Sequence, residues 1–106
     1  MFDIDHQPVF HRRVSINVPG GGKEDFGAAF AALPVSEQSQ FDLGTTDGTR
    51  DFLSRAIVGL DDIVDHQGEP VPFSFELRDR LLDKGWTRQP LFDAYVAGLA
   101  EAVRGN

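Results

Sequence analysis

Cysteine is absent from this 106-residue chain, and tryptophan, tyrosine and methionine each occur once. Without cysteine there is no disulfide framework, no thiolate nucleophile and no cysteine-based zinc site. No apolar run approaches the roughly 20 residues of a membrane-spanning helix. The acidic start Met1–Asp5 also lacks the basic region of a signal peptide. We therefore expect a soluble protein that stays in the cytoplasm and does not bind membranes.

Basic residues are scarce as well. Ten Lys and Arg stand against 17 Asp and Glu, which gives a net charge of −7. This sign repels phosphate backbones, so nucleic acid is not an expected partner. Because 41% of the residues are hydrophobic and 25% are charged, the composition is that of a globular protein rather than a disordered one. The length then predicts one domain over residues 1–106.

Strand signals dominate residues 1–35. Apolar and polar side chains alternate between Pro8 and Pro19, as in a half-buried strand, and three glycines at 20–22 supply a hairpin loop. Residues 25–33 are rich in alanine, which favours helix, but Phe26, Ala28, Phe30 and Ala32 recur with period two. The glycine loop before them and Pro34 after them favour a paired strand. An N-terminal antiparallel β-hairpin is therefore expected.

Residues 36–106 are expected to be mainly helical. A short helix of one or two turns starts at Ser36, Thr45 or Thr46 caps a helix over about 47–58, and Ser74 caps a helix over Phe75–Asp83. Extended pieces joined by a turn at Gly68 lie between the last two. The clearest helix runs from near Gln89 to Arg104, with Gly105 as its terminator. The fold class is therefore α+β, with the hairpin packed against three to four α-helices.

Histidine and aspartate offer one route to metal chemistry. The residues concerned are His6, His11, His66, Asp3, Asp5, Asp61, Asp62 and Asp65. No two histidines have the spacing that shares a helix face, and Asp61–Asp65 lacks the ligand pattern of a calcium loop. Solvated surface carboxylates are therefore favoured, and no metal or cofactor is expected. A small metal-dependent hydrolase using His66 with Asp61, Asp62 or Asp65 remains an alternative.

Other catalytic motifs are missing. The glycines at 20–22 precede Lys23, but the spacing is not that of a phosphate-binding loop, and Glu24 and Asp25 would repel phosphate. No serine lies in the Gly-x-Ser-x-Gly elbow of a hydrolase. We therefore predict no catalytic residues and a protein that is not an enzyme.

Aromatic side chains are the candidates for protein contacts. Aromatic residues are enriched at binding hot spots, but the same residues often close a hydrophobic core. Each candidate is therefore open to both interpretations. The candidates are Phe73, Phe75, Trp86, Phe92 and Tyr95.

A family resemblance spans most of residues 47–104. It is carried by Gly48–Leu53, Ile57–Asp65, Gly68–Ser74, Leu81–Asp83 and Leu91–Tyr95. Read together, these segments resemble small tail assembly chaperones of tailed bacteriophages and prophages. The likeness includes a Gly-x-Pro-x-Pro-Phe turn and a late Ala-Tyr, although Leu60 stands where the family more usually has tryptophan.

The resemblance implies a non-enzymatic protein of the host bacterial cytoplasm, made during virion assembly. Such chaperones bind the tape-measure protein and assist the assembly of tail tube protein around it, and a homo-oligomer is expected. An acidic binder with modest apolar patches suits this task because it shields an apolar client and stays in solution. The alternatives are a structural component of the phage tail or head–tail junction, the metal-dependent hydrolase, and an acidic inhibitor that mimics nucleic acid.

Overall fold

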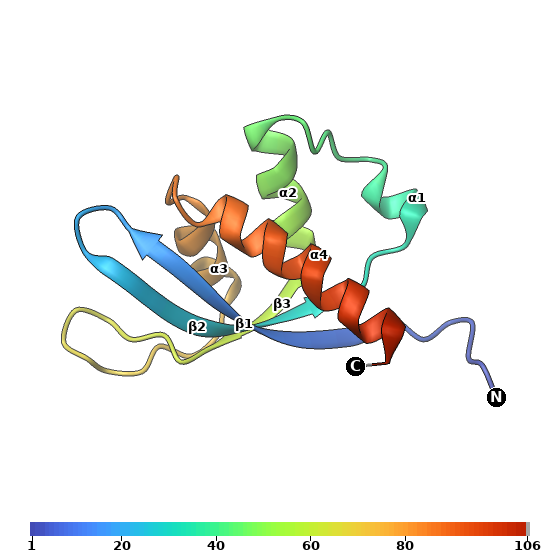
Figure 1. Ribbon diagram of the computed structural model, residues 1–106, viewed down its shortest axis with the longest axis horizontal. Helices are drawn as coiled ribbons and strands as arrows, with labels where there is room; N and C mark the ends of the chain where they lie inside the picture. The colour runs from blue at the N-terminus through green and yellow to red at the C-terminus, as the bar shows by residue number, and fades with distance from the viewer. Residues whose placement is uncertain (106) are drawn as a thin grey trace.

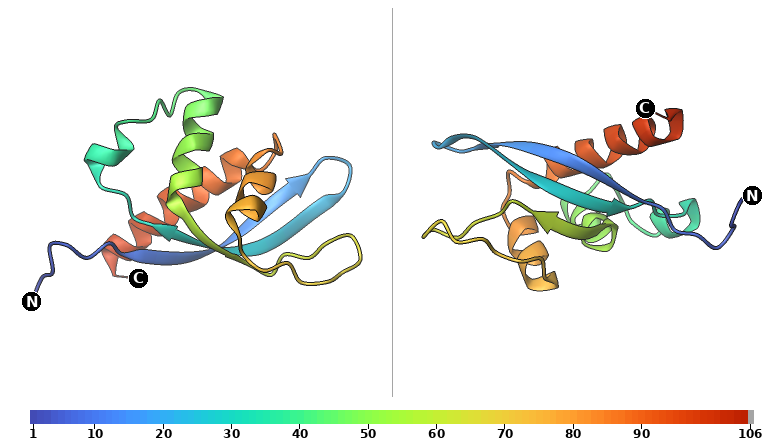
Figure 2. Two further views of the ribbon diagram at one scale, coloured as in Figure 1. Left: turned by 180° about the vertical axis from the view of Figure 1, so that it is seen from behind. Right: turned by 90° about the horizontal axis from the view of Figure 1, so that it is seen from below.

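The computed structural model describes residues 1–105 and shows a three-stranded antiparallel sheet with its helices on one face (Figures 1 and 2). The strands are β1 (Val9–Val18), β2 (Gly22–Ala31) and β3 (Ile57–Asp61), in the spatial order β1-β2-β3. The helices are α1 (Val35–Gln38), α2 (Thr46–Ala56), α3 (Phe75–Leu82) and α4 (Arg88–Arg104). The predicted α+β fold with an N-terminal hairpin is confirmed.

The hairpin pairs β1 with β2 over their full lengths, from Val9 opposite Ala31 to Val18 opposite Gly22. Gly20 and Gly22 have φ angles of 74° and 87°, which other residues rarely adopt, so glycine is required in this loop. The alanine-rich segment is a strand, as its period-two pattern predicted. It becomes the central strand of the sheet because β3 pairs along its other edge.

The predicted helix over 47–58 is too long by two residues. Helix α2 ends at Ala56, and the chain passes directly into β3, whose Leu60 pairs with Ala28. The apolar residues at 52, 53, 56 and 57 fit a helical stripe, so the sequence pattern continues smoothly through the junction. From Ile57 onward the backbone N–H and C=O groups form hydrogen bonds with the open edge of β2. The stability gained from this pairing outweighs the helix propensity of these residues.

Helix caps agree with the sequence at two positions and differ at a third. The hydroxyl of Thr45 accepts the N–H of Gly48 at 2.9 Å, and the hydroxyl of Ser74 accepts the N–H of Leu77 at 2.9 Å. Ser36, however, lies inside α1 and is not its cap. Pro34 takes that position in an extended conformation, and its carbonyl accepts the first helical N–H groups. A proline carbonyl can do this as well as any other, so the serine was a misleading signal.

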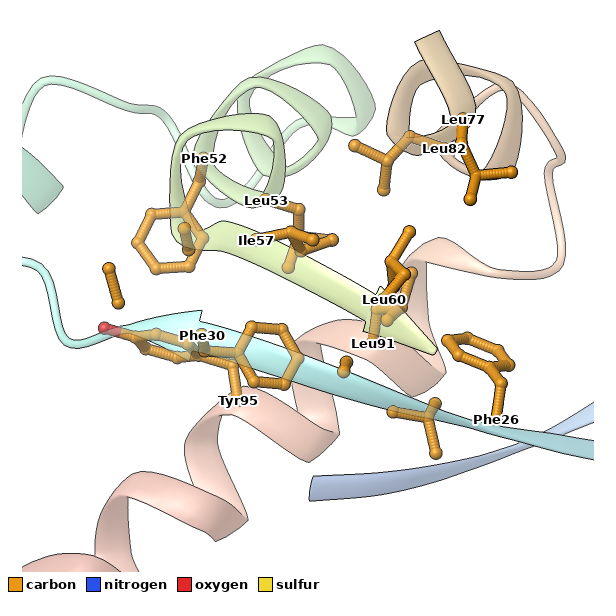
Figure 3. Close-up of a cluster of buried hydrophobic side chains, with 14 of the residues drawn as sticks. Phe26, Phe30, Phe52, Leu53, Ile57, Leu60, Leu77, Leu82, Leu91 and Tyr95 are labelled. Atoms are coloured by element: carbon orange, nitrogen blue, oxygen red, sulfur yellow. The ribbon is translucent and has the colours of Figure 1, made fainter. Parts of the chain in front are cut away.

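The core lies between the inner face of the sheet and helices α2, α3 and α4 (Figure 3). Tyr95 of α4 is 3% exposed, and its ring centroid lies 5.0 Å from that of Phe52 and 5.6 Å from that of Phe30, both nearly perpendicular. Edge-to-face pairs of this kind add to the stabilisation from burial. The Tyr95 hydroxyl also accepts the backbone N–H of Leu33 at 3.2 Å, which joins α4 to the end of the hairpin.

Replacing Tyr95 by phenylalanine is expected to lower the free energy of unfolding by about 1–2 kcal/mol. The ring keeps its packing, but the buried N–H of Leu33 loses its acceptor. Urea unfolding of the two proteins measures the change. The urea concentration at the midpoint should fall, while the slope of the free energy of unfolding against urea concentration stays constant. An unchanged midpoint would show that this hydrogen bond does not contribute to stability.

The opposite face of the sheet carries no helix (Figure 2, right). Along β1 the exposed side chains on this face are His11, Arg13, Ser15 and Asn17, alternating with the inward-facing Val14 and Ile16. Within residues 1–105, no helix combines the length and the apolar character needed to cross a membrane.

Candidate functional site

A groove runs between α2, β3 and the first turn of α3 and has a volume of about 550 Å³. Its apolar part consists of Phe41, Ile57, Val58 and Phe75, and its polar part of Asp51, Ser54, Arg55 and Arg78. We call this set the aromatic groove. A concave surface of this kind, with an apolar floor and a few charged groups, is the usual form of a binding site.

Phe75 is the most exposed side chain of the aromatic groove, at 67%. It is the first residue of α3, and the Ser74 cap fixes where that helix begins. Its ring lies edge-on to Phe73, with centroids 6.2 Å apart, and the guanidinium carbon of Arg78 lies 4.7 Å from its centroid. Such a cation–π contact contributes about 0.5–1 kcal/mol at an exposed site. The ring is therefore held in position although most of it faces solvent.

Charged side chains lie at the rim of the aromatic groove. They are the two arginines, Arg55 and Arg78, and one aspartate, Asp51. Arg78 donates to the carbonyl of Ser54 at 2.8 Å and to Asp79 at 3.0 Å, and Arg55 pairs with Glu37. Counting Asp51, Glu37 and Asp79, the carboxylates at the groove outnumber its two arginines, so the groove has no excess of positive charge.

The five predicted contact residues do not form one surface. Phe75 lines the aromatic groove and Phe73 packs against it. Trp86 is 39% exposed between α3 and α4, with the ammonium of Lys84 5.7 Å from its ring. Phe92 is half-buried and packs edge-on against core Phe52, and Tyr95 belongs to the core, the alternative that the sequence left open.

Sequence reasoning missed Phe41 and Val58 of the aromatic groove. Phe41 lies between the short helix expected from Ser36 and the helix expected over 47–58, and Val58 falls at the end of the latter. A signal was nevertheless present, because Ile57 and Val58 are adjacent β-branched residues followed by Gly59. Had Ile57 and Val58 been assigned to a strand, Val58 would have been predicted as an exposed side chain on an edge strand.

The residues of the metal-hydrolase alternative lie mostly in turns. Asp65 accepts the backbone N–H groups of Gln67 and Glu69 at 2.9 and 3.0 Å, and Asp62 pairs with Arg13 at 3.0 Å. Across residues 1–105, no three histidine, aspartate or glutamate side chains gather closely enough to hold a metal ion. These carboxylates stabilise the turn that follows β3.

Arg13 carries the clearest electrostatic perturbation. Its guanidinium donates to Asp62 at 3.0 Å and to Asp25 at 3.2 Å, joining β1 to β2 and to the residue after β3. These hydrogen bonds, to Asp62 first and Asp25 second, raise the pKa of Arg13. Because arginine is already charged at every working pH, the arrangement orders the sheet edge and has no acid–base role.

Comparison with known proteins finds no family model, no curated protein and no solved structure that matches this chain. The segment Gly68–Ser74 leads into α3 without a turn at Pro70–Phe73, and its Ser74 provides the cap that sets Phe75 at the aromatic groove.

Proposed function

We propose that this protein is a non-enzymatic tail assembly chaperone of a tailed phage or prophage, which binds the tape-measure protein and assists assembly of the tail tube around it. The observation that carries the proposal is the aromatic groove, in which an exposed phenylalanine is held by a helix cap and an arginine. The groove offers an apolar surface to another polypeptide, and the resemblance in sequence supports the tape-measure protein as that polypeptide.

The physical role is to cover apolar side chains of a long helical client until the tube encloses them. A helix face with apolar residues complements the apolar floor of the aromatic groove. Because the groove is open to solvent and formed by few side chains, we expect each contact to be weak enough for tail tube protein to displace the chaperone. Many copies along one client still cover it, because repeated sites act together, and the net charge of −7 keeps the complex in solution.

Replacing Phe75 by aspartate is expected to weaken co-purification with the tape-measure protein roughly tenfold or more, because the change puts a charge at the centre of an apolar contact. Co-expression followed by affinity purification measures the captured client and its soluble fraction. Val103→Asp is the matched control, since Val103 is 79% exposed on α4 outside the groove. It should capture as much client as the unmodified chain.

Three outcomes would contradict parts of the proposal. If the unmodified chain neither keeps the tape-measure protein soluble nor co-purifies with it, the chaperone function is wrong. If Phe75→Asp captures client normally, the client binds at another surface. Stable incorporation into purified virions would instead favour the alternative of a structural tail or head–tail junction component.

A further inference from the structure

Strand β1 forms one open edge of the sheet along its whole length of 10 residues. Its register with β2 begins at Val9 opposite Ala31 and continues without a shift, and in the same register the N–H of Ala32 donates to the carbonyl of Pro8. Bonded residues alternate along an antiparallel pair. The even-numbered residues of β1 therefore bond to β2, and the odd-numbered residues direct their N–H and C=O groups away from the sheet.

The outward backbone groups of β1 are free to pair. Among residues 1–105, no backbone or side-chain group bonds to them. Proteins commonly protect such an edge by a proline, a β-bulge or a short strand. The other edge strand, β3, is indeed short, with 5 residues, whereas β1 has no proline and no bulge. The inward-pointing charge of Arg12 is neutralised by Glu101 of α4, so it does not exclude a further strand either.

Helix α4 lies beside β1 and turns this edge into a groove (Figure 2, right). The groove has a volume of about 400 Å³. We call it the edge groove, and it is lined by Arg12–Ser15 of β1 and by Pro90, Asp93, Ala94 and Ala97 of α4. The four α4 residues recur at the spacing of one helix face. Because two of them are alanines, this face of the helix leaves room for side chains of another segment.

The edge groove specifies its occupant through the backbone. A row of alternating N–H and C=O groups is satisfied by another extended backbone, and a helix has no such row to offer. We propose that the edge groove binds an extended segment of a partner protein, which adds to the sheet as a fourth strand. Its main chain pairs with His11, Arg13 and Ser15, and its small or β-branched apolar side chains face Ala94 and Ala97.

A second copy of β1 is a poorer occupant of the edge groove. The inward side chains of β1 are already covered by its own α4, so two helices would have to share the space above the junction. The edge groove and the aromatic groove also lie at opposite edges of the sheet. The site therefore goes beyond the function proposed above, because one chain can hold a helical client at one edge and an extended segment of another protein at the other.

Amide hydrogen exchange of the full chain, followed by NMR, tests the site with a synthetic peptide in which valine and threonine alternate. Without peptide, the amides of His11, Arg13 and Ser15 should exchange quickly because they bond to no other group. At a peptide concentration about ten times its Kd, their exchange should slow roughly tenfold. Unchanged exchange at these three amides in the presence of bound peptide would overturn the proposal.

N-methylation of the peptide separates strand addition from other modes of binding. Alternate N–H groups of a strand face opposite sides, so methyl groups on one set block pairing with β1 and those on the other set do not. A peptide methylated at its valines and one methylated at its threonines should therefore differ roughly tenfold or more in Kd. Equal Kd values would contradict strand addition, and the comparison needs no variant of the protein.

Ser15→Pro is the matching change in the protein. It removes one outward N–H at an edge position, where a strand tolerates proline, and should weaken peptide binding roughly tenfold or more. Ser15→Thr keeps the N–H and should bind like the unmodified chain, as should Phe75→Asp, whose change lies in the aromatic groove. If Ser15→Pro instead abolishes a rise in mass with concentration in sedimentation velocity, the occupant is a second copy and the proposed partner is wrong. Client capture uses the other groove, so failure of either test leaves the other untouched.

Discussion

Replacing Phe52 by alanine is expected to lower the free energy of unfolding by about 3–5 kcal/mol, because it leaves a cavity at the centre of the core. Phe52 is 0% exposed, and its ring lies 5.0 to 5.9 Å from the rings of Tyr95, Phe92 and Phe41. Domains of this size have total stabilities of about 5–15 kcal/mol, so the variant would lose a large share. Thermal and urea unfolding followed by circular dichroism measure the loss.

Phe75→Ala is the matched control, since it removes the same group from an exposed position. Its free energy of unfolding should fall by no more than about 1 kcal/mol, which is the contribution of the contact between the Phe75 ring and Arg78. The pair thus separates the two kinds of phenylalanine in this protein, one that holds the fold and one that is available to a partner. Equal losses for both variants would show that Phe75 is part of the core and would remove the basis for the aromatic groove.

Replacing Gly48 by alanine is expected to lower the free energy of unfolding by about 1–3 kcal/mol. In a helix the same change ordinarily stabilises by about 1 kcal/mol. Here the new Cβ would lie 1.9 Å from the carbonyl oxygen of Asp42 and 2.8 Å from the hydroxyl of Thr45, so the backbone before α2 must move and the helix cap is disturbed. The steric clash at Gly48 therefore costs more free energy than the higher helix propensity of alanine gains.

Gly85→Ala tests whether this reversal comes from the neighbours of Gly48. A Cβ on Gly85 would meet nothing within 4 Å, so the substitution should be neutral or stabilising by about 0.4–1 kcal/mol. Urea midpoints for the two variants should therefore shift in opposite directions, or only the Gly48 variant should shift. A stabilised Gly48→Ala protein would mean that the 42–45 loop does not pack on α2 as described.

Local signals predicted much of the fold. The period-two alternation of β1, the glycines of the hairpin loop and the Thr45 and Ser74 caps depend on residues close together in sequence, and each was interpreted correctly. The start of β3 was missed because its first residue also continues the apolar stripe of α2. Whether Ile57 continues the helix or begins a strand depends on pairing with β2, which lies some thirty residues earlier. A single sequence does not show which strand β3 pairs with.

The candidate site was harder to predict than the fold. Phe75 and Tyr95 both follow patterns suited to either core or contact, yet one is 67% and the other 3% exposed. The difference arises from position on the helix, since Phe75 lies in the first turn of α3 and Tyr95 on the face of α4 that meets the sheet. Phe41 and Val58 join the groove only through tertiary packing, so sequence spacing gave no indication of their proximity.

The helix-free face of the sheet also makes the protein easy to observe by spectroscopy. Ser15 is exposed on that face of β1, at the opposite edge of the sheet from β3 and its groove. Since the chain has no cysteine, Ser15→Cys would create a single thiol for attaching a fluorophore. Emission anisotropy from that probe would test in real time whether a partner binds, and the probe itself would leave the aromatic groove open.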